Sequence, residues 1–168
     1  STQQPSPYTP PPSRWRLISS NFARLHKQLR RFRHIFSYYD ICLFFVEGDR
    51  VAQTQVIPIK AANEAGVPSL IVPFAISFPW GPATVRMRSK HFKKLYDAST
   101  GIRRLAGLLF PRYVFHFRGK PVLYQSPMQI GVMWIMGLLP RYPWTLGGGN
   151  STHMFIESQQ ALKICTDL

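Results

Sequence analysis

The chain has 168 residues, 45% of them hydrophobic and 14% aromatic, which suits one globular domain with its own core and excludes an intrinsically disordered protein. Its 21 Lys and Arg outnumber its 7 Asp and Glu, and the net charge of +14 predicts an anionic partner: a nucleic acid, an anionic membrane surface or a phosphorylated substrate. With only Cys42 and Cys165, the sequence excludes a disulfide framework and predicts reduced, buried cysteines in a cytosolic protein.

The N-terminal region combines a proline-rich lead with a basic helix. Residues 1–13 contain five prolines among polar residues, so we expect a disordered lead, and they lack the apolar run of a signal peptide. Arg14–Phe36 then places apolar residues at helical spacing, with basic residues on the remaining faces. The apolar stripe consists of Phe22, Leu25, Leu29, Phe32 and Phe36. The basic face is either simply solvated or in contact with an anionic surface, and the sequence leaves both open.

One stretch, Tyr39–Arg50, is the centre of the functional hypotheses. Ile41–Val46 is an unbroken apolar run that predicts a strand buried in the middle of a parallel sheet. The run ends in Glu47-Gly48-Asp49-Arg50, and ligands of open α/β sheets bind at the carboxyl ends of the strands. Glu47 and Asp49 are therefore the candidates for acid–base chemistry, and capping of the next helix is the alternative role for Asp49.

The elements that follow predict a β-α-β unit. Val51–Ala65 has the pattern of a helix, with Gly66 at its C-terminus and Pro58 expected to kink or split it. Ser69–Phe74 predicts a second buried strand, joined to the first by a right-handed crossover. We expect residues 14–168 to form one α/β domain, a Rossmann-like three-layer fold with a mainly parallel sheet, helices on both faces and a β-hairpin insertion.

The middle of the chain is strongly basic. Ala75–Ala98 predicts a loop followed by a short helix, on which Arg86 and Arg88 are candidates to bind phosphate groups. Ser99–Leu109 predicts an amphipathic helix with two arginines outward. Its apolar side chains, which we expect to face the core, are Ile102, Leu105, Leu108 and Leu109.

Two further elements complete the predicted core. Tyr113–Tyr124 has the pattern of a hairpin with a turn around Gly119. Ser126–Leu139 predicts a helix that is apolar nearly all round, so it is either deeply buried or dipped into a lipid surface. Its compact apolar part, Ile130–Leu139, is too short to span a bilayer. The side chains expected to contact a membrane are Met128, Trp134 and Met136.

A triple glycine, Gly147-Gly148-Gly149, follows a short strand pattern at Pro143–Leu146 and precedes Asn150. Glycine leaves room for a close approach of the backbone to another group, and a tight turn is the alternative. The segment matches neither the dinucleotide-binding nor the P-loop pattern. The sequence ends within a predicted helix, Glu157–Leu168, so we expect a fragment or one half of a larger assembly. Because no Cys/His pair has zinc-ligand spacing, we expect no metal site, and we expect no cofactor.

Several of these segments together resemble a known family. They are the run F-F-V-E-G-D-R, the helix end A-N-E-A-G-V-P, the strand S-L-I-V-P-F and the later P-W-T-L-G-G-G-N-S-T followed by F-I-E-S-Q. In this order they look like the N-terminal half of GT-B-fold glycosyltransferases, similar to bacterial enzymes of surface-polysaccharide and lipid A disaccharide synthesis and to nucleotide-sugar 2-epimerases. The resemblance extends over Phe36–Leu168.

The resemblance implies an acceptor-binding, Rossmann-like domain. By the family pattern, Gly48 and Asp49 line the cleft between two domains, together with the loop after Phe74 and Gly147–Asn150. The C-terminal half, which holds the nucleotide sugar in such enzymes, is missing from this sequence. It would come from a missing segment or a partner chain, and we expect the chain alone to be inactive.

Two hypotheses follow. The first is the acceptor half of a glycosyltransferase, peripheral on the cytoplasmic face of the cell membrane and acting on a lipid-linked or phosphorylated acceptor. Asp49 or Glu47 would be the general base or would anchor the acceptor hydroxyl, and Arg50, Arg86 and Arg88 would hold phosphates. The second hypothesis is a non-catalytic module that binds nucleic acid, indicated by the charge and by basic residues interleaved with aromatic ones, as in R-F-R-H-I-F and R-Y-V-F-H-F-R.

Overall fold

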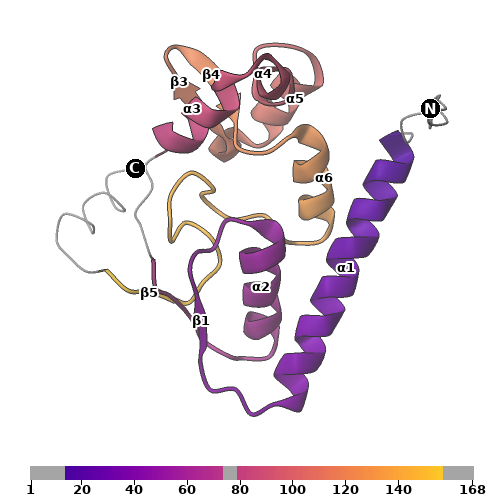
Figure 1. Ribbon diagram of the computed structural model, residues 1–168, viewed down its shortest axis with the longest axis vertical. Coiled ribbons are helices and arrows are strands. Elements are labelled where there is room, and N and C mark those ends of the chain that lie inside the picture. The colour runs from indigo at the N-terminus through magenta and orange to yellow at the C-terminus, as the bar shows by residue number, and fades with distance from the viewer. Residues whose placement is uncertain (1–13, 74–78, 157–168) are drawn as a thin grey trace, which may run out of the picture.

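The computed structural model describes residues 14–73 and 79–156 and shows an α/β protein (Figure 1). Its elements, in chain order, are α1 (Arg14–Tyr38), β1 (Phe44–Val46), the π-helical segment η1 (Ala52–Val56), α2 (Ile57–Glu64), β2 (Ser69–Ile71), α3 (Trp80–Arg88), α4 (Lys90–Tyr96), α5 (Gly101–Leu109), the 3-10 turn η2 (Pro111–Tyr113), β3 (Val114–Phe117), β4 (Lys120–Leu123), α6 (Pro127–Ile135) and β5 (His153–Met154). The predicted lead at 1–13, Phe74, Cys165 and the predicted helix at 157–168 lie outside the described residues.

The described sheet consists of three short parallel strands in the order β1-β2-β5. Val46 of β1 pairs with Ile71 of β2, which pairs in turn with Met154 of β5, so the three strands end level with one another. The predicted β-α-β unit is confirmed, because β1 and β2 are parallel neighbours connected through α2.

β1 lies at an edge of the described sheet rather than in its middle. Phe45 is 60% exposed, and Cys42 and Leu43, just before the strand, are exposed as well. The predictions of a central strand buried on both faces and of a buried Cys42 were therefore wrong. An unbroken apolar run shows that a segment is extended and hydrophobic, but it does not show how many strands flank it.

Two helices are stacked on one face of the sheet, and Figure 1 shows α2 between β1 and α1. Ile59 of α2 packs in one cluster with Val46, Ile71 and Leu146. The rest of α2 packs against the predicted apolar stripe of α1, through Ile57, Ala61 and Ala62 on α2 and Leu25, Leu29 and Phe36 on α1. The prediction placed helices on the other face of the sheet as well. On that face of β1, the ring of Phe45 is exposed.

Proline and glycine shape the connection between β1 and β2 as the sequence predicts. The expected helix is divided into η1 and α2, with Pro58 in the first turn of α2, where a missing N–H costs least. Gly66 follows the helix with a φ of +73°, the left-handed conformation that ends many helices.

The helices α3 to α6 and the hairpin β3–β4 form a second cluster around Val122, Leu123 and Trp144, drawn in the upper part of Figure 1. The hairpin is confirmed, and its turn has positive φ at both Arg118 and Gly119. α6 begins at Pro127 with a capping box made by Ser126 and Gln129. Ile130 of α6 packs in this second cluster whereas Val132 and Met133 pack against α1 and α2, so α6 joins the two cores.

α5 is oriented opposite to the prediction. Its large apolar side chains are 55–71% exposed, and the residue that it buries is Ala106. Of the two arginines predicted to face outward, Arg104 is exposed and Arg103 is half-buried. The helix approaches the hairpin through small residues, since a Cβ placed on Gly107 would lie 3.0 Å from Cγ2 of Val114. The exposed side chains are Ile102, Leu105, Leu108 and Leu109.

None of the helices in the described part of the chain is both long and apolar enough to cross a membrane.

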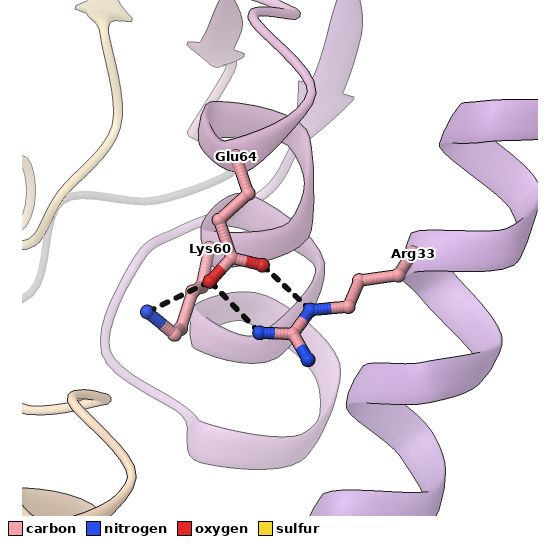
Figure 2. A network of polar contacts seen from close by, with 3 residues as sticks. All are labelled: Arg33, Lys60 and Glu64. Atoms are coloured by element: carbon pink, nitrogen blue, oxygen red, sulfur yellow. Dashed lines mark hydrogen bonds and ion pairs between the residues drawn. The ribbon is translucent and has the colours of Figure 1, made fainter.

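An ion-pair network of Arg33, Lys60 and Glu64 connects the basic helix α1 to α2 (Figure 2). The Nε and Nη2 atoms of Arg33 lie 2.7 Å and 3.0 Å from the two carboxylate oxygens of Glu64, and Nζ of Lys60 lies 3.0 Å from Oε1. The hydrogen bond from Arg33, with the help of Lys60, lowers the pKa of Glu64 from 4.5 to about 2.

The pair predicts a pH-dependent effect of Arg33→Gln. Because both side chains are partly exposed, we expect a loss of only about 0.5–1 kcal/mol in the free energy of unfolding at neutral pH. Glu64 has a lowered pKa in the folded state, so its contribution is complete above pH 4.5 and disappears as the pH falls to about 2. Urea unfolding across this pH range measures the difference.

The control is Arg31→Gln, which removes the same charge from an exposed position of the same helix. An equal loss in both variants, or a loss from Arg33→Gln that does not change with pH, would contradict the role of the pair.

Candidate ligand site at the carboxyl end of the sheet

Asp49 follows the end of β1 and connects it to the glycine segment. Its Oδ1 accepts a hydrogen bond from the N–H of Gly147 at 3.2 Å, and its Oδ2 accepts one from the N–H of Gly149 at 2.5 Å. The hydroxyl of Ser151 donates to Oδ2 at 3.4 Å. The side chain is 1% exposed, so both carboxylate oxygens are enclosed by the protein. These contacts place Asp49 against the segment before β5 rather than at the N-terminus of the following helix.

The glycines are required by this contact. A Cβ on Gly149 would lie 2.5 Å from the backbone oxygen and Oδ2 of Asp49, and a Cβ on Gly148 would overlap the backbone oxygen of Tyr142. Gly147 has a φ of +79°, which L side chains rarely adopt. The predicted close approach is thus present, and the group approached is another part of the same chain. The strand predicted at Pro143–Leu146 is instead a series of turns.

Burial raises the pKa of Asp49 above its usual value of 3.8. The hydrogen bonds from Gly149 and Gly147, the charge of Arg50 and the hydroxyl of Ser151 all act in the opposite direction. Two backbone N–H groups aimed at one carboxylate compensate part of the cost of removing it from water.

Gln55 holds the loop between β1 and η1, a role that the sequence analysis missed. Its Oε1 accepts hydrogen bonds from the N–H groups of Arg50 and Val51 at 3.0 Å and 2.9 Å. Its Nε2 donates to Oε1 of Glu47 at 3.4 Å. Gly48 packs against the same amide, and a Cβ there would lie 3.1 Å from it. The backbone at Glu47–Val51 is therefore fixed from both sides, by Gln55 and by Asp49.

Two arginines, Arg50 and Arg86, contact Trp144. Nη1 of Arg50 donates to the backbone oxygen of Trp144 at 3.4 Å. Arg86 donates from Nε to the backbone oxygen of Tyr124 at 2.8 Å, and its guanidinium lies 4.5 Å from the Tyr124 ring centre and 5.6 Å from that of Trp144. Burial lowers the pKa of Arg86, and the charge of Arg50 acts in the same direction. Arg86 contacts carbonyl oxygens and aromatic rings, so within the described residues its charge has no carboxylate partner.

A crevice of about 700 Å³ lies beside these groups. It is bounded by the glycine segment and by Met154, at the end of β5, so it lies at the carboxyl edge of the sheet. Its volume is typical of small-molecule sites. The side chains that give it chemical character are Arg112, Phe115, Tyr142, Trp144 and Thr145. The guanidinium of Arg112 lies 4.9 Å from the centre of the Tyr142 ring.

The other predicted site residues are more scattered. Glu47 is exposed, Gly48 is buried, and Arg88 is exposed in the last turn of α3. Asn150 is exposed, and its backbone oxygen accepts a hydrogen bond from Asn63 at 2.8 Å. Phe74 lies outside the described residues. In residues 14–73 and 79–156, no three His, Cys, Asp or Glu side chains gather in a way that could hold a metal ion.

Comparisons with protein-family models, with curated proteins and with solved structures give no match to this chain. The class that the structure itself defines is an α/β protein with a small parallel sheet and a ligand-sized crevice at the carboxyl edge of that sheet.

The contact between Asp49 and the glycine segment predicts that Gly149→Ala is strongly destabilising. The new methyl group would overlap the backbone and carboxylate of Asp49, so we expect a loss of about 2–4 kcal/mol in the free energy of unfolding. Thermal or urea unfolding measures this loss.

Gly131→Ala is the matched control. A Cβ at Gly131 in α6 meets nothing within 4 Å, and alanine has the higher helix propensity, so this variant should gain up to about 1 kcal/mol. A mild effect of Gly149→Ala, similar in size to that of the control, would show that the close approach does not exist in solution.

Proposed function

We propose that this chain is the acceptor-binding half of a membrane-associated glycosyltransferase, with a Rossmann-like fold. A missing C-terminal half or a partner chain would bind the nucleotide sugar, and the sugar would be transferred to a lipid-linked or phosphorylated acceptor. The observation that carries the proposal is the crevice at the carboxyl edge of the sheet, where open α/β proteins bind their ligands.

The lining of the crevice suits a saccharide with an anionic group. Phe115, Tyr142 and Trp144 line the crevice, and the ring of Tyr142, which is 51% exposed, offers an apolar surface on which the C–H face of a sugar ring can pack. Arg112 in its wall, together with Arg50 and Arg86 beside Trp144, supplies positive charge for a phosphate. Arg86 is partly buried against carbonyl oxygens and aromatic rings, so an anion bound beside it would offset part of the cost of burying its charge.

The two predicted carboxylates take different roles in this proposal. Glu47 is exposed at the end of β1 and is the general base or the anchor of the acceptor hydroxyl. Asp49 is enclosed with both oxygens bonded to the glycine segment, so it acts as a positioning residue that keeps Glu47 and the crevice wall in place. Gln55 supports Glu47 from the other side.

Attachment to a membrane is supported by an exposed apolar surface on α5 and α6, which we call the apolar face. It consists of Ile102, Leu105, Leu108, Leu109, Trp134 and Ile135, each at least 55% exposed. The ring of Trp134 lies 6.2 Å from that of Phe110, so the ends of the two helices are adjacent. Met128 is also exposed, whereas Met136 packs against the core around α1. Contiguous exposed apolar surface marks interaction sites, and basic residues nearby attract anionic lipid.

The nucleic-acid hypothesis has less support from the structure. In the segment R-Y-V-F-H-F-R, Tyr113 is 3% exposed and Phe115 packs on Trp144 at 5.2 Å between ring centres. In R-F-R-H-I-F, Phe36 is buried. The aromatic rings interleaved with basic residues are thus used in the two cores and offer few stacking platforms for bases.

The proposal predicts that the chain binds sugar phosphates in the crevice. Ligand-observed NMR with hexose and N-acetylhexosamine 1-phosphates should show binding with Kd of about 1 mM or tighter, and Tyr142→Ala should weaken it at least about tenfold, roughly 1.4 kcal/mol. Tyr39→Ala is the control, because Tyr39 is exposed and precedes β1. Absence of binding, or equal effects of the two variants, would remove the crevice as the acceptor site.

Attachment to the membrane predicts co-sedimentation with vesicles that contain phosphatidylglycerol, and less with purely phosphatidylcholine vesicles. Replacing Leu108 and Leu109 with Gln should reduce sedimentation several-fold, whereas Val85→Gln, which removes an exposed apolar side chain from α3, should not. Excess RNA serves as competitor. If RNA displaces the vesicles and binds with a steep salt dependence, the nucleic-acid module becomes the better explanation.

A further inference from the structure

An apolar groove of about 620 Å³ lies between α1, α4, α5 and α6. α6 contacts both α1 and α5, and Figure 1 shows it beside the N-terminal part of α1 and below α5. Its walls come from each of the four helices, through Ile18, Leu95, Ile102, Met128, Val132 and Ile135. Ile102 and Ile135 are 70% and 71% exposed, so these walls face solvent in the isolated chain.

Two cations, Lys94 and Arg103, line the same groove. Arg103 donates to the backbone oxygens of Asp97 and Lys94 at 2.8 Å and 2.7 Å, and to the hydroxyl of Thr100 at 3.2 Å. Three of the five N–H donors of its guanidinium are therefore used on neutral acceptors, which fix its position without cancelling its charge.

The acidic residue nearest in sequence does not neutralise this pair of cations. The carboxylate of Asp97 accepts hydrogen bonds from the N–H and the hydroxyl of Ser99, and the charges that act on it belong to Lys93 and Lys120. Neither Asp97 nor any other carboxylate belongs to the lining of the groove. An apolar cavity with a fixed, uncompensated positive charge selects an occupant that is apolar over most of its length and anionic at one end.

We propose that the groove holds one hydrocarbon chain of an anionic phospholipid, with the lipid phosphate bound by Lys94 and Arg103. The inference rests on the membrane attachment in the proposed function and goes further, because it assigns a discrete binding site for a single lipid molecule.

A lipid fits the surroundings of the groove better than a peptide helix does. Ile102 and Ile135 belong both to the groove and to the apolar face, which continues beyond it through Leu105, Leu109 and Trp134. A bilayer would cover this face at the same time as one of its lipids occupied the groove, whereas a single bound helix would leave part of the face in water.

Gly131 allows a direct test. It lies in α6 and lines the groove, and a Cβ there meets nothing within 4 Å. Gly131→Leu should fill the groove while favouring the helix, so loss of binding would not reflect unfolding. The probe is monomeric lysophosphatidic acid below its micelle concentration, titrated by calorimetry against the full chain. We expect saturable binding that Gly131→Leu weakens at least about tenfold, and that Lys94→Gln reduces to the level seen with lysophosphatidylcholine.

The control is Leu109→Gln, which alters the apolar face outside the groove lining. It should reduce vesicle sedimentation and leave the affinity for monomeric lysophosphatidic acid within twofold. Glycerol 3-phosphate, which has the phosphate without the chain, should bind at least tenfold more weakly.

Three results would overturn the inference: no binding of the monomeric lipid, unchanged binding in Gly131→Leu, or displacement of the lipid by an acidic amphipathic model peptide that itself binds more tightly. If monomeric lipid fails to bind while vesicles still sediment with the chain, the groove is excluded and the membrane attachment stands. If vesicles also fail to bind, the membrane part of the proposed function fails as well.

Discussion

The bond between Asp49 and the glycine segment is the constraint on which the carboxyl edge of the sheet depends. It joins positions about 100 residues apart, the end of β1 and the segment that leads into β5. A carboxylate is costly to bury, and here it is tolerated because two backbone N–H groups point at it from glycines that alone can come so close. Gly147, one of these two glycines, also lines the crevice together with Gly148, so the packing contact and the candidate ligand site are built from one segment.

Three of the acidic side chains make contacts within the molecule, which leaves fewer carboxylates to balance the basic residues. Asp49 bonds to the glycine segment, Glu64 pairs with Arg33 and Lys60, and Asp97 caps the turn at Ser99. Each of these carboxylates stabilises a contact within the chain. With 21 Lys and Arg against 7 Asp and Glu in the sequence, the surplus of positive charge favours anionic partners.

Much of the fold could be predicted because its signals are local. The strand–helix–strand unit, the division of the helix at Pro58, the end at Gly66 and the hairpin turn at Gly119 each depend on a few neighbouring residues. The candidate site could be predicted only in part. Its position could be predicted from the carboxyl end of β1. The partner of Asp49, however, lies about 100 residues away in the sequence, and no sequence pattern predicts the role of Gln55.

The orientation of α5 shows what the spacing of apolar residues in a helix cannot predict. An amphipathic pattern tells that one face is apolar, and it cannot tell whether that face points to the core or to a partner. Here the helix packs through Ala106 and Gly107, and Gly107 is so close to Val114 that a larger side chain would require Val114 to move. Rotating the helix to bury Leu105 and Leu109 would force branched side chains into this narrow contact, at the cost of overpacking. The apolar face is thus a consequence of how α5 meets the hairpin, and within the described residues its large side chains stay exposed because the helix packs through its small ones.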